Sequence, residues 1–174
     1  MATADVLLAL LADGPAHGYD LKRGHDDWFP GSRPLAFGQV YATLGRLQRS
    51  GLVQVAEIRA ERGPERIVYA LSARGRRRLR DWLAEPVEPA VASAGELVRK
   101  AVAAVRTGAD AGTVLVRQRD AHLARLWELE RRPPERDAGA QLARDHIVAH
   151  LDADLRWLEA AIERLGGPLG SPPA

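Results

Sequence analysis

The chain contains no cysteine, which excludes disulfide bonds, thiolate nucleophiles and cysteine-based metal sites. Aromatic residues make up only 5% of the 174 residues, so a core must be built mainly from leucine, valine and alanine, which favour helices. The apolar run from Val6 to Ala12 is too short to span a membrane, and it lacks the basic start of a signal peptide. With 46% hydrophobic residues, the chain is expected to be a globular, mainly helical cytoplasmic protein.

Sequence motifs of common enzyme classes are also missing. There is no phosphate-binding loop, nucleophile elbow, HExxH motif or glycine-rich dinucleotide turn, and the serines and histidines lack the context of a catalytic triad. We therefore expect neither enzymatic activity nor a cofactor.

Charge is distributed unevenly along the chain. Residues 1–84 contain 13 basic and 9 acidic side chains, a net charge of +4, and the remaining 12 basic and 14 acidic side chains give −2. An N-terminal module that binds nucleic acid and a second, neutral module would produce this asymmetry.

The stretch from Phe37 to Val53 predicts an amphipathic helix that ends at a glycine and leads into a strand. Val40, Leu44 and Leu47 share a narrow arc at 100° per residue and should face a core. Gly51 is suited to the left-handed turn that closes a helix, and Leu52 starts an extended segment.

The opposite face of this helix carries Ala42, Gly45, Arg46 and Arg49, with Gln39 and Tyr41 beside them. Two nearly bare positions between arginines would let another surface approach the backbone closely, as a DNA major groove does. An ordinary surface helix that is merely solvated by its arginines is the alternative interpretation.

The neighbouring segments predict a winged helix-turn-helix. We expect helices over 5–11 and 16–29 before the stretch, and strands over 52–58 and 66–71 after it, joined by a charged wing tip at 60–65. Ser72 is a plausible N-cap of a fourth helix. That helix has the densest charge of the chain, which either contacts a partner or forms a solvated face: Arg74, Arg76, Arg77, Arg78 and Arg80.

Three segments resemble the PadR family of bacterial transcriptional regulators. They are Leu11 to Leu21 with its His-Gly-Tyr sequence, Gly38 to Tyr41 with Leu44, Leu47 and Gly51 to Val53, and Arg66 to Gly75. Two positions depart from the family pattern: Ala42 stands where many members have proline, and Gly45 replaces a more usual polar residue. The resemblance implies a homodimer that binds inverted repeats and often represses its own operon or a neighbouring gene.

Side-chain shape suggests individual DNA contacts. Gln39 matches the edge of adenine, and Arg46 or Arg49 matches guanine or a phosphate. Ala42 and Thr43 on the same helix are also expected to face DNA. Tyr41 either donates its hydroxyl to a phosphate or only packs its ring. Lys22, Arg62 and Arg66 are candidates for phosphate contacts that fix orientation.

The second half predicts helices only, over 96–106, 113–132 and 137–165. In the last of these, apolar residues recur at spacings of three and four, a coiled-coil seam that we expect a second copy of the chain to cover. The seam consists of Ile147, Leu151, Leu155, Leu158, Ile162 and Leu165.

Two further features of this half have alternative interpretations. Trp127 and Trp157 either line a pocket for an apolar or aromatic effector or simply pack between helices. His146, His150 and Asp154 follow each other at four-residue spacing, which suits a divalent metal by spacing alone, but nothing nearby supplies a fourth ligand and we assign no metal site.

The sequence thus predicts a winged helix-turn-helix domain over 1–84, a linker over 85–95, a helical dimerisation and effector domain over 96–166 and a flexible tail over 167–174. The expected function is a DNA-binding transcriptional regulator, a repressor that a small aromatic effector releases. A winged-helix module that binds protein and never touches DNA is the alternative.

Overall fold

The computed structural model describes residues 2–30, 32–59 and 66–166 and divides into two compact units. The first comprises Met1–Glu85 together with Val102–Ala109, and the second comprises Pro86–Ala101 together with Asp110–Ala174. The wing tip over 60–65 and the tail over 167–174, both predicted from the sequence, lie outside the described residues.

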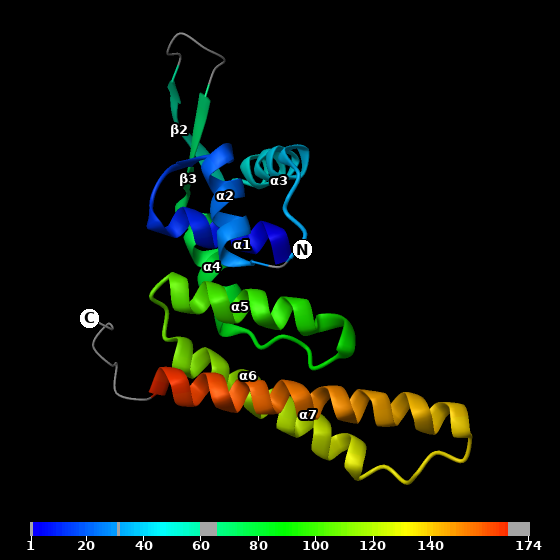
Figure 1. Cartoon of the computed structure of the whole chain (residues 1–174). Helices are drawn as coiled ribbons and strands as arrows, with labels where there is room; N and C mark the ends of the chain where they lie inside the picture. Colours follow the sequence, from blue (N-terminus) through cyan, green and yellow to red (C-terminus); the bar gives the residue numbers. More distant parts are fainter. Residues whose placement is uncertain (1, 31, 60–65, 167–174) are drawn as a thin grey trace. The chain divides into compact units, whose positions relative to one another are not determined.

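The first unit combines four helices with a small antiparallel sheet, as the sequence predicts (Figure 1). Its elements in chain order are α1 (Ala2–Leu10), η1 (Leu11–Asp13), β1 (Ala16–His17), α2 (Gly18–Trp28), α3 (Phe37–Arg49), β2 (Val53–Arg59), β3 (Arg66–Leu71) and α4 (Ala73–Ala84).

Helix α1 is the centre of this unit. Its residues Val6, Leu7, Leu8 and Ala9 are fully buried, and the helix contacts α2, α3 and α4. A helix that is apolar on nearly all sides can only be accommodated in this way, since any exposed face would leave leucine in water.

Helix α3 ends as its sequence predicts. Gly51 adopts a left-handed φ of 66°, its N–H donates to Gln48 O, and the N–H of Leu52 donates to Leu47 O at 2.9 Å. These two bonds form a Schellman motif, which satisfies carbonyl groups at the end of a helix and turns the chain sharply into β2.

The same turn anchors helix α4. The Ser72 hydroxyl lies 2.7 Å from Gly51 O and 3.0 Å from Leu52 O, and it accepts a hydrogen bond from the N–H of Gly75. Ser72 is therefore the N-cap of α4, which confirms the prediction. Gly75 is buried so tightly that a Cβ atom there would lie only 2.0 Å from Leu52 O.

The sheet has the order β1-β3-β2, with antiparallel pairing throughout. The predicted second helix began at Ala16, which is wrong: Ala16 and His17 pair with Tyr69 and Val68 of β3, and His17 caps α2 by accepting from the N–H of Tyr19. A pairing partner more than fifty residues away favours the extended conformation here, and local periodicity cannot reveal such a partner.

The second unit is helical throughout its described residues. It contains η2 (Val91–Ser93), most of α5 (Ala94–Arg106), α6 (Ala111–Glu130) and α7 (Ala138–Gly166). Helices α6 and α7 pack side by side as an antiparallel hairpin (Figure 1). Arg144 of α7 donates to the carbonyl groups of Leu129, Arg132 and Pro133 and so caps the end of α6.

The segment expected to be a linker over 85–95 is packed instead. Val87 is buried, and both its backbone groups bond to the side-chain amide of Gln118: its N–H donates to Oε1 at 2.6 Å and its carbonyl accepts from Nε2 at 2.7 Å. A buried amide that satisfies both groups is a strong anchor, since each would otherwise lose its hydrogen bonds to water. Pro86 and Pro89 suggested a linker, whereas the partner Gln118 lies far along the chain.

Glycine substitutions in α3 and α4 test this packing. Gly75→Ala should lower the free energy of unfolding by about 1–3 kcal/mol, because the new methyl group meets backbone atoms that cannot move separately. Gly45→Ala is the matched control, since its Cβ would meet only Arg49 Nη1 at 3.5 Å, and it should raise stability by roughly 0.5–1 kcal/mol. Urea unfolding of both variants measures the difference, and equal effects would contradict the close approach at Gly75.

Candidate nucleic-acid interface

The outer face of α3 is nearly bare. Gly38, Ala42, Gly45 and Arg49 follow at spacings of four, three and four and therefore share one face, opposite the buried Val40, Leu44 and Leu47. A Cβ atom at Gly38 would meet nothing within 4 Å, and one at Gly45 would meet only the end of Arg49. Intramolecular packing therefore does not require small residues on this face.

Polar side chains flank the bare face. Gln39 and Arg46 are both exposed, and the Arg46 guanidinium donates to Thr43 Oγ1 at 2.9 Å. Thr43 itself was predicted to face DNA, which is wrong: its side chain is buried and its hydroxyl donates to Gln39 O. Thr43 belongs to the core stripe and acts on the surface only by orienting Arg46.

The side chain of Tyr41 packs against α2 and is still partly exposed to solvent. Its ring lies against Gly18, where a Cβ atom would come within 2.6 Å of Tyr41 Cε1, yet 43% of the residue is exposed. Burial raises the pKa of the nearby Tyr69 phenol, and the Tyr41 phenol raises it further. Both alternatives considered for Tyr41, packing and an outward hydroxyl, are compatible with this arrangement.

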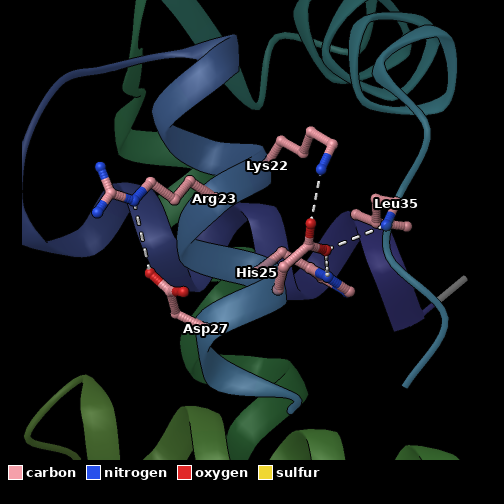
Figure 2. A network of polar contacts seen from close by, with 6 residues as sticks. Lys22, Arg23, His25, Asp27 and Leu35 are labelled. Carbon is pink, nitrogen blue, oxygen red and sulfur yellow. Dashed lines mark hydrogen bonds and ion pairs between the residues drawn. The ribbon is translucent and has the colours of Figure 1, made fainter. Parts of the chain in front are cut away.

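Lys22 takes part in a polar network that fixes the segment between α2 and α3 (Figure 2). Asp26 Oδ2 accepts from Lys22 Nζ at 2.7 Å, while Oδ1 accepts from the N–H of Leu35 at 3.1 Å and lies 3.3 Å from His25 Nδ1. Sequence reasoning named Lys22 but missed Asp26, although their four-residue spacing on a helix is typical of an ion pair.

Opposing effects act on the carboxyl group of Asp26. Burial raises its pKa, but the hydrogen bonds from Lys22, the Leu35 N–H and His25 together outweigh burial, so that the pKa lies below its ordinary value. Asp26 is therefore ionised at neutral pH and neutralises Lys22.

The structure describes only some of the other basic side chains that were considered for contacts with DNA or another partner. Arg62 lies outside the described residues, and Arg66 is described only as the first backbone position of β3. In the arginine cluster of α4, Arg78 pairs at 3.0 Å with the buried Asp5, and Arg76 donates to Leu71 O. These two arginines attach α4 to the rest of the unit, which favours a structural role for part of the cluster.

The seam predicted for dimerisation has a different role in the structure. Leu151, Leu155 and Leu158 are already buried within one chain, and Leu158 belongs to a core cluster with Leu97, Ala101 and Leu115. Ile162 and Leu165 pack against the same cluster, and Ile147 is half-buried. The period correctly indicated a buried face, but α5 and α6 cover it, so a second copy is not needed there.

Trp127 and Trp157 do not form a common pocket within the chain. They are 58% and 39% exposed. In the antiparallel hairpin, Asp154 lies opposite His122 and Arg144 opposite Leu129, so the two tryptophans are separated along the helices by about ten residues, or roughly 15 Å. The two rings therefore lie apart within one chain, and a role for either of them in binding an effector stays a prediction.

The histidine triplet of α7 is arranged differently from a metal site. Asp154 Oδ2 lies 3.6 Å from His122 Nε2 and 3.7 Å from His150 Nε2, while the ring of His146 lies beside the ring of His150 with their centroids 6.3 Å apart. Among the residues that the structure describes, no group of three histidine or acidic side chains is placed to hold a metal ion. His122 and Gln118, buried partners in this network, had not been singled out from the sequence.

Replacing Asp26 tests the network at the interface. Asp26→Asn should lower the free energy of unfolding at pH 7 by roughly 1–2 kcal/mol, because charge-assisted hydrogen bonds are lost. A carboxyl group whose folded-state pKa is lowered stabilises the fold above its unfolded pKa of about 3.9, and this contribution disappears as pH falls through the folded-state pKa. The variant and the wild type should therefore converge in acid.

Asp27→Asn is the matched control for that measurement. Asp27 is 71% exposed and only 4.0 Å from Arg23, so its replacement should change stability by less than about 0.5 kcal/mol at either pH. Urea titrations at pH 7 and near pH 2.5 measure both variants. A loss for Asp26→Asn that persists unchanged in acid would contradict the ionic role.

Comparisons with known proteins agree with the fold and the sequence motifs. Residues 7–81 match the model of the transcriptional regulator PadR-like family. The probable transcriptional regulator Rv1176c of Mycobacterium tuberculosis is 30% identical over 89 residues, which cover 51% of this chain and 47% of that relative, so the chain matches about half of the relative's length.

Solved structures of Bacillus subtilis PadR match this chain at low sequence identity. The complex with operator DNA is 20% identical with a TM-score of 0.46, covering 95% of this chain and 99% of that chain. The complex with p-coumaric acid is also 20% identical, with a TM-score of 0.42 and the same coverage. Both ligands are properties of that protein.

Within the described part of the chain, no helix is both long and apolar enough to cross a membrane. The matched family consists of transcriptional regulators and is not an enzyme family. The three sequence motifs, the helical core with its small sheet and the match over residues 7–81 agree with one another. Residues 7–81 are therefore similar to the PadR-like family of transcriptional regulators.

Proposed function

We propose that the chain is a sequence-specific regulator that binds double-stranded DNA through the outer face of α3. The observation that carries this proposal is the open space around Gly38 and Gly45. Each glycine inside a helix destabilises it by about 0.8–1.0 kcal/mol relative to alanine. Because no contact among the described residues requires that cost, an external surface that comes close to the helix backbone explains it best.

The chemistry around the bare face suits the edges of bases. Gln39 can pair with adenine N6 and N7, and Arg46 or Arg49 with guanine O6 and N7. The bond from Arg46 to Thr43 holds its guanidinium in a fixed direction before DNA arrives, which lowers the entropy lost on binding. Tyr41 and Lys22 lie beside this face and are suited to phosphate contacts, which set orientation without reading sequence.

Bulk on the bare face should block DNA while leaving the fold intact. Gly45→Leu should lower affinity for a selected duplex at least about tenfold, and Arg46→Ala with Arg49→Ala should lower it by about 1–3 kcal/mol for each lost base contact. Ala12→Leu adds the same bulk at an exposed position of η1 and should have no effect. Fluorescence anisotropy measures binding, and thermal unfolding verifies folding.

Salt dependence separates this proposal from a module that binds only protein. DNA affinity should fall steeply with salt, with a slope set by the number of neutralised phosphates, whereas an apolar protein contact should change little. If Gly45→Leu and the double arginine variant bind as the wild type does, α3 is not the reading helix.

We also propose that the chain acts as a homodimer on an inverted repeat and represses the adjacent gene. With the seam of α7 already covered, the surface available to a second copy is the opposite side of the second unit. Leu142 and Trp157 are 71% and 39% exposed, and Ala149 and Ala153 lie between them at spacings of seven, four and four on one face of α7. Two-fold pairing would cover this face on both copies. A bound dimer that overlaps a promoter would exclude the polymerase.

Charges placed on that face should separate the copies without unfolding them. Leu142→Arg combined with Trp157→Arg should convert a dimer into a folded monomer, because two arginines would be buried without partners. Leu158→Ala is the contrasting variant: it opens a cavity in the core of one chain and should cost about 2–5 kcal/mol of stability. Light scattering measures mass, and a wild type that remains monomeric at micromolar concentration would exclude the dimer.

A further inference from the structure

Two exposed aromatic rings meet beside the proposed reading helix. Tyr19, in the first turn of α2, and Phe37, the first residue of α3, stack with their centroids 5.8 Å apart and their planes 16° from parallel. They are 56% and 45% exposed. The sequence alone assigns neither ring a contact, because eighteen residues separate them and no periodicity connects them.

The position of Phe37 is held from two sides. Tyr19 covers one side by stacking, and Lys22 Nζ lies 5.2 Å from the centroid of the Phe37 ring while it bonds to Asp26. The ring is therefore fixed in place although nearly half of the residue is in water. A ring that served only to join α2 to α3 would be better buried, as Leu21 and Val40 are on the same two helices.

Phe37 also lies at the N-terminal end of α3, where a recognition helix contacts bases. In helix-turn-helix proteins, residues near the N-terminus of the recognition helix contact base edges. Among the groups that base pairs present in the major groove, the C5-methyl group of thymine is the apolar one, and phenylalanine is among the side chains that contact it. The basic side chains Arg46 and Arg49 on the same helix as Phe37 favour the negatively charged DNA over a neutral or basic partner.

We propose that Phe37 contacts the methyl group of one thymine in each half-site and so adds a position of specificity, with Tyr19 as the residue that positions its ring. This inference rests on the proposed DNA binding and extends it to the base that is read. Its chemistry differs from that of Gln39, Arg46 and Arg49, which would recognise hydrogen-bonding groups.

Selection from a random duplex library tests the inference and identifies the preferred site in the same experiment. The wild type should enrich a site with thymine at one fixed position per half-site. Phe37→Ala should lose the preference at that position and keep the others, Tyr19→Ala should weaken the same preference, and Phe37→Leu should retain most of it. Val105→Ala is the control, since Val105 is 49% exposed but lies on α5, and its selected site should be unchanged.

Replacing the selected thymines by deoxyuridine removes only the methyl groups. Wild-type affinity should fall about fourfold for each thymine, the equivalent of one buried methyl group, while Phe37→Ala should bind both duplexes equally. This readout also separates a positioning role of Tyr19 from a purely structural one, because a loss of stability would weaken binding to both duplexes alike.

The outcomes distinguish the two levels of the proposal. A wild type that enriches no sequence and binds no duplex would overturn the proposed function and this inference together. The wild type could instead select a site while Phe37→Ala keeps the same thymine preference and the same sensitivity to deoxyuridine. That result would overturn only the proposed thymine contact of Phe37, and the two rings would then be expected to bind a protein partner.

Discussion

The approach of α4 to the segment that leaves α3 is the contact on which the first unit depends. Ser72 and Gly75 contact the backbone of Gly51 and Leu52 so closely that no side chain fits at Gly75. The end of α3, the start of β2 and the start of α4 are thereby joined at one point. Any shift of α4 would displace the end of α3, so the direction of the bare face is set by backbone packing on its buried side.

That rigidity explains how a short helix can carry the bare face that is proposed to contact DNA. The intrinsic propensity of α3 is weakened by Gly38 and Gly45, and isolated helices of this length are marginal in water. Its stability must come from the buried Val40, Leu44 and Leu47 and from the Schellman turn at Gly51. Tertiary packing on one side thus permits residues on the other side that a free helix would not tolerate.

The sequence predicted those features whose cause is local. The C-terminal glycine of α3, the N-cap Ser72 and the bounds of β3 follow from turn and cap chemistry within a few residues. It did not predict features whose cause is a distant partner: Ala16 and His17 become a strand because of β3, and Val87 is buried because of Gln118. On α3, the helical period predicted that Gln39 and Arg46 lie away from the core, whereas the burial of Thr43 depends on where the core stripe ends.

The seam of α7 is a second case in which the sequence pattern does not identify a distant partner. A period of three and four identifies a face that must leave water, but it contains no information about whether the covering helix comes from the same chain or from another copy. In this chain α5 and α6 cover it, so that Leu158 is fully buried. The exposed Leu142 and Trp157 lie outside the seam period, and only the packed structure distinguishes them from core residues.

Two ion pairs within the first unit reduce the positive charge that is available to bind DNA. Lys22 is neutralised by Asp26, and Arg78 by Asp5, so part of the excess positive charge of residues 1–84 is balanced within the fold. Non-specific attraction to phosphates grows with the number of free cations, so these two ion pairs lower it. Under the proposed function, discrimination between sites would come largely from close fit: from Gly38, Ala42 and Gly45, which would admit the groove, and from the fixed side chains around them. A surface of this kind gains affinity only where the shape and base edges of the duplex match it.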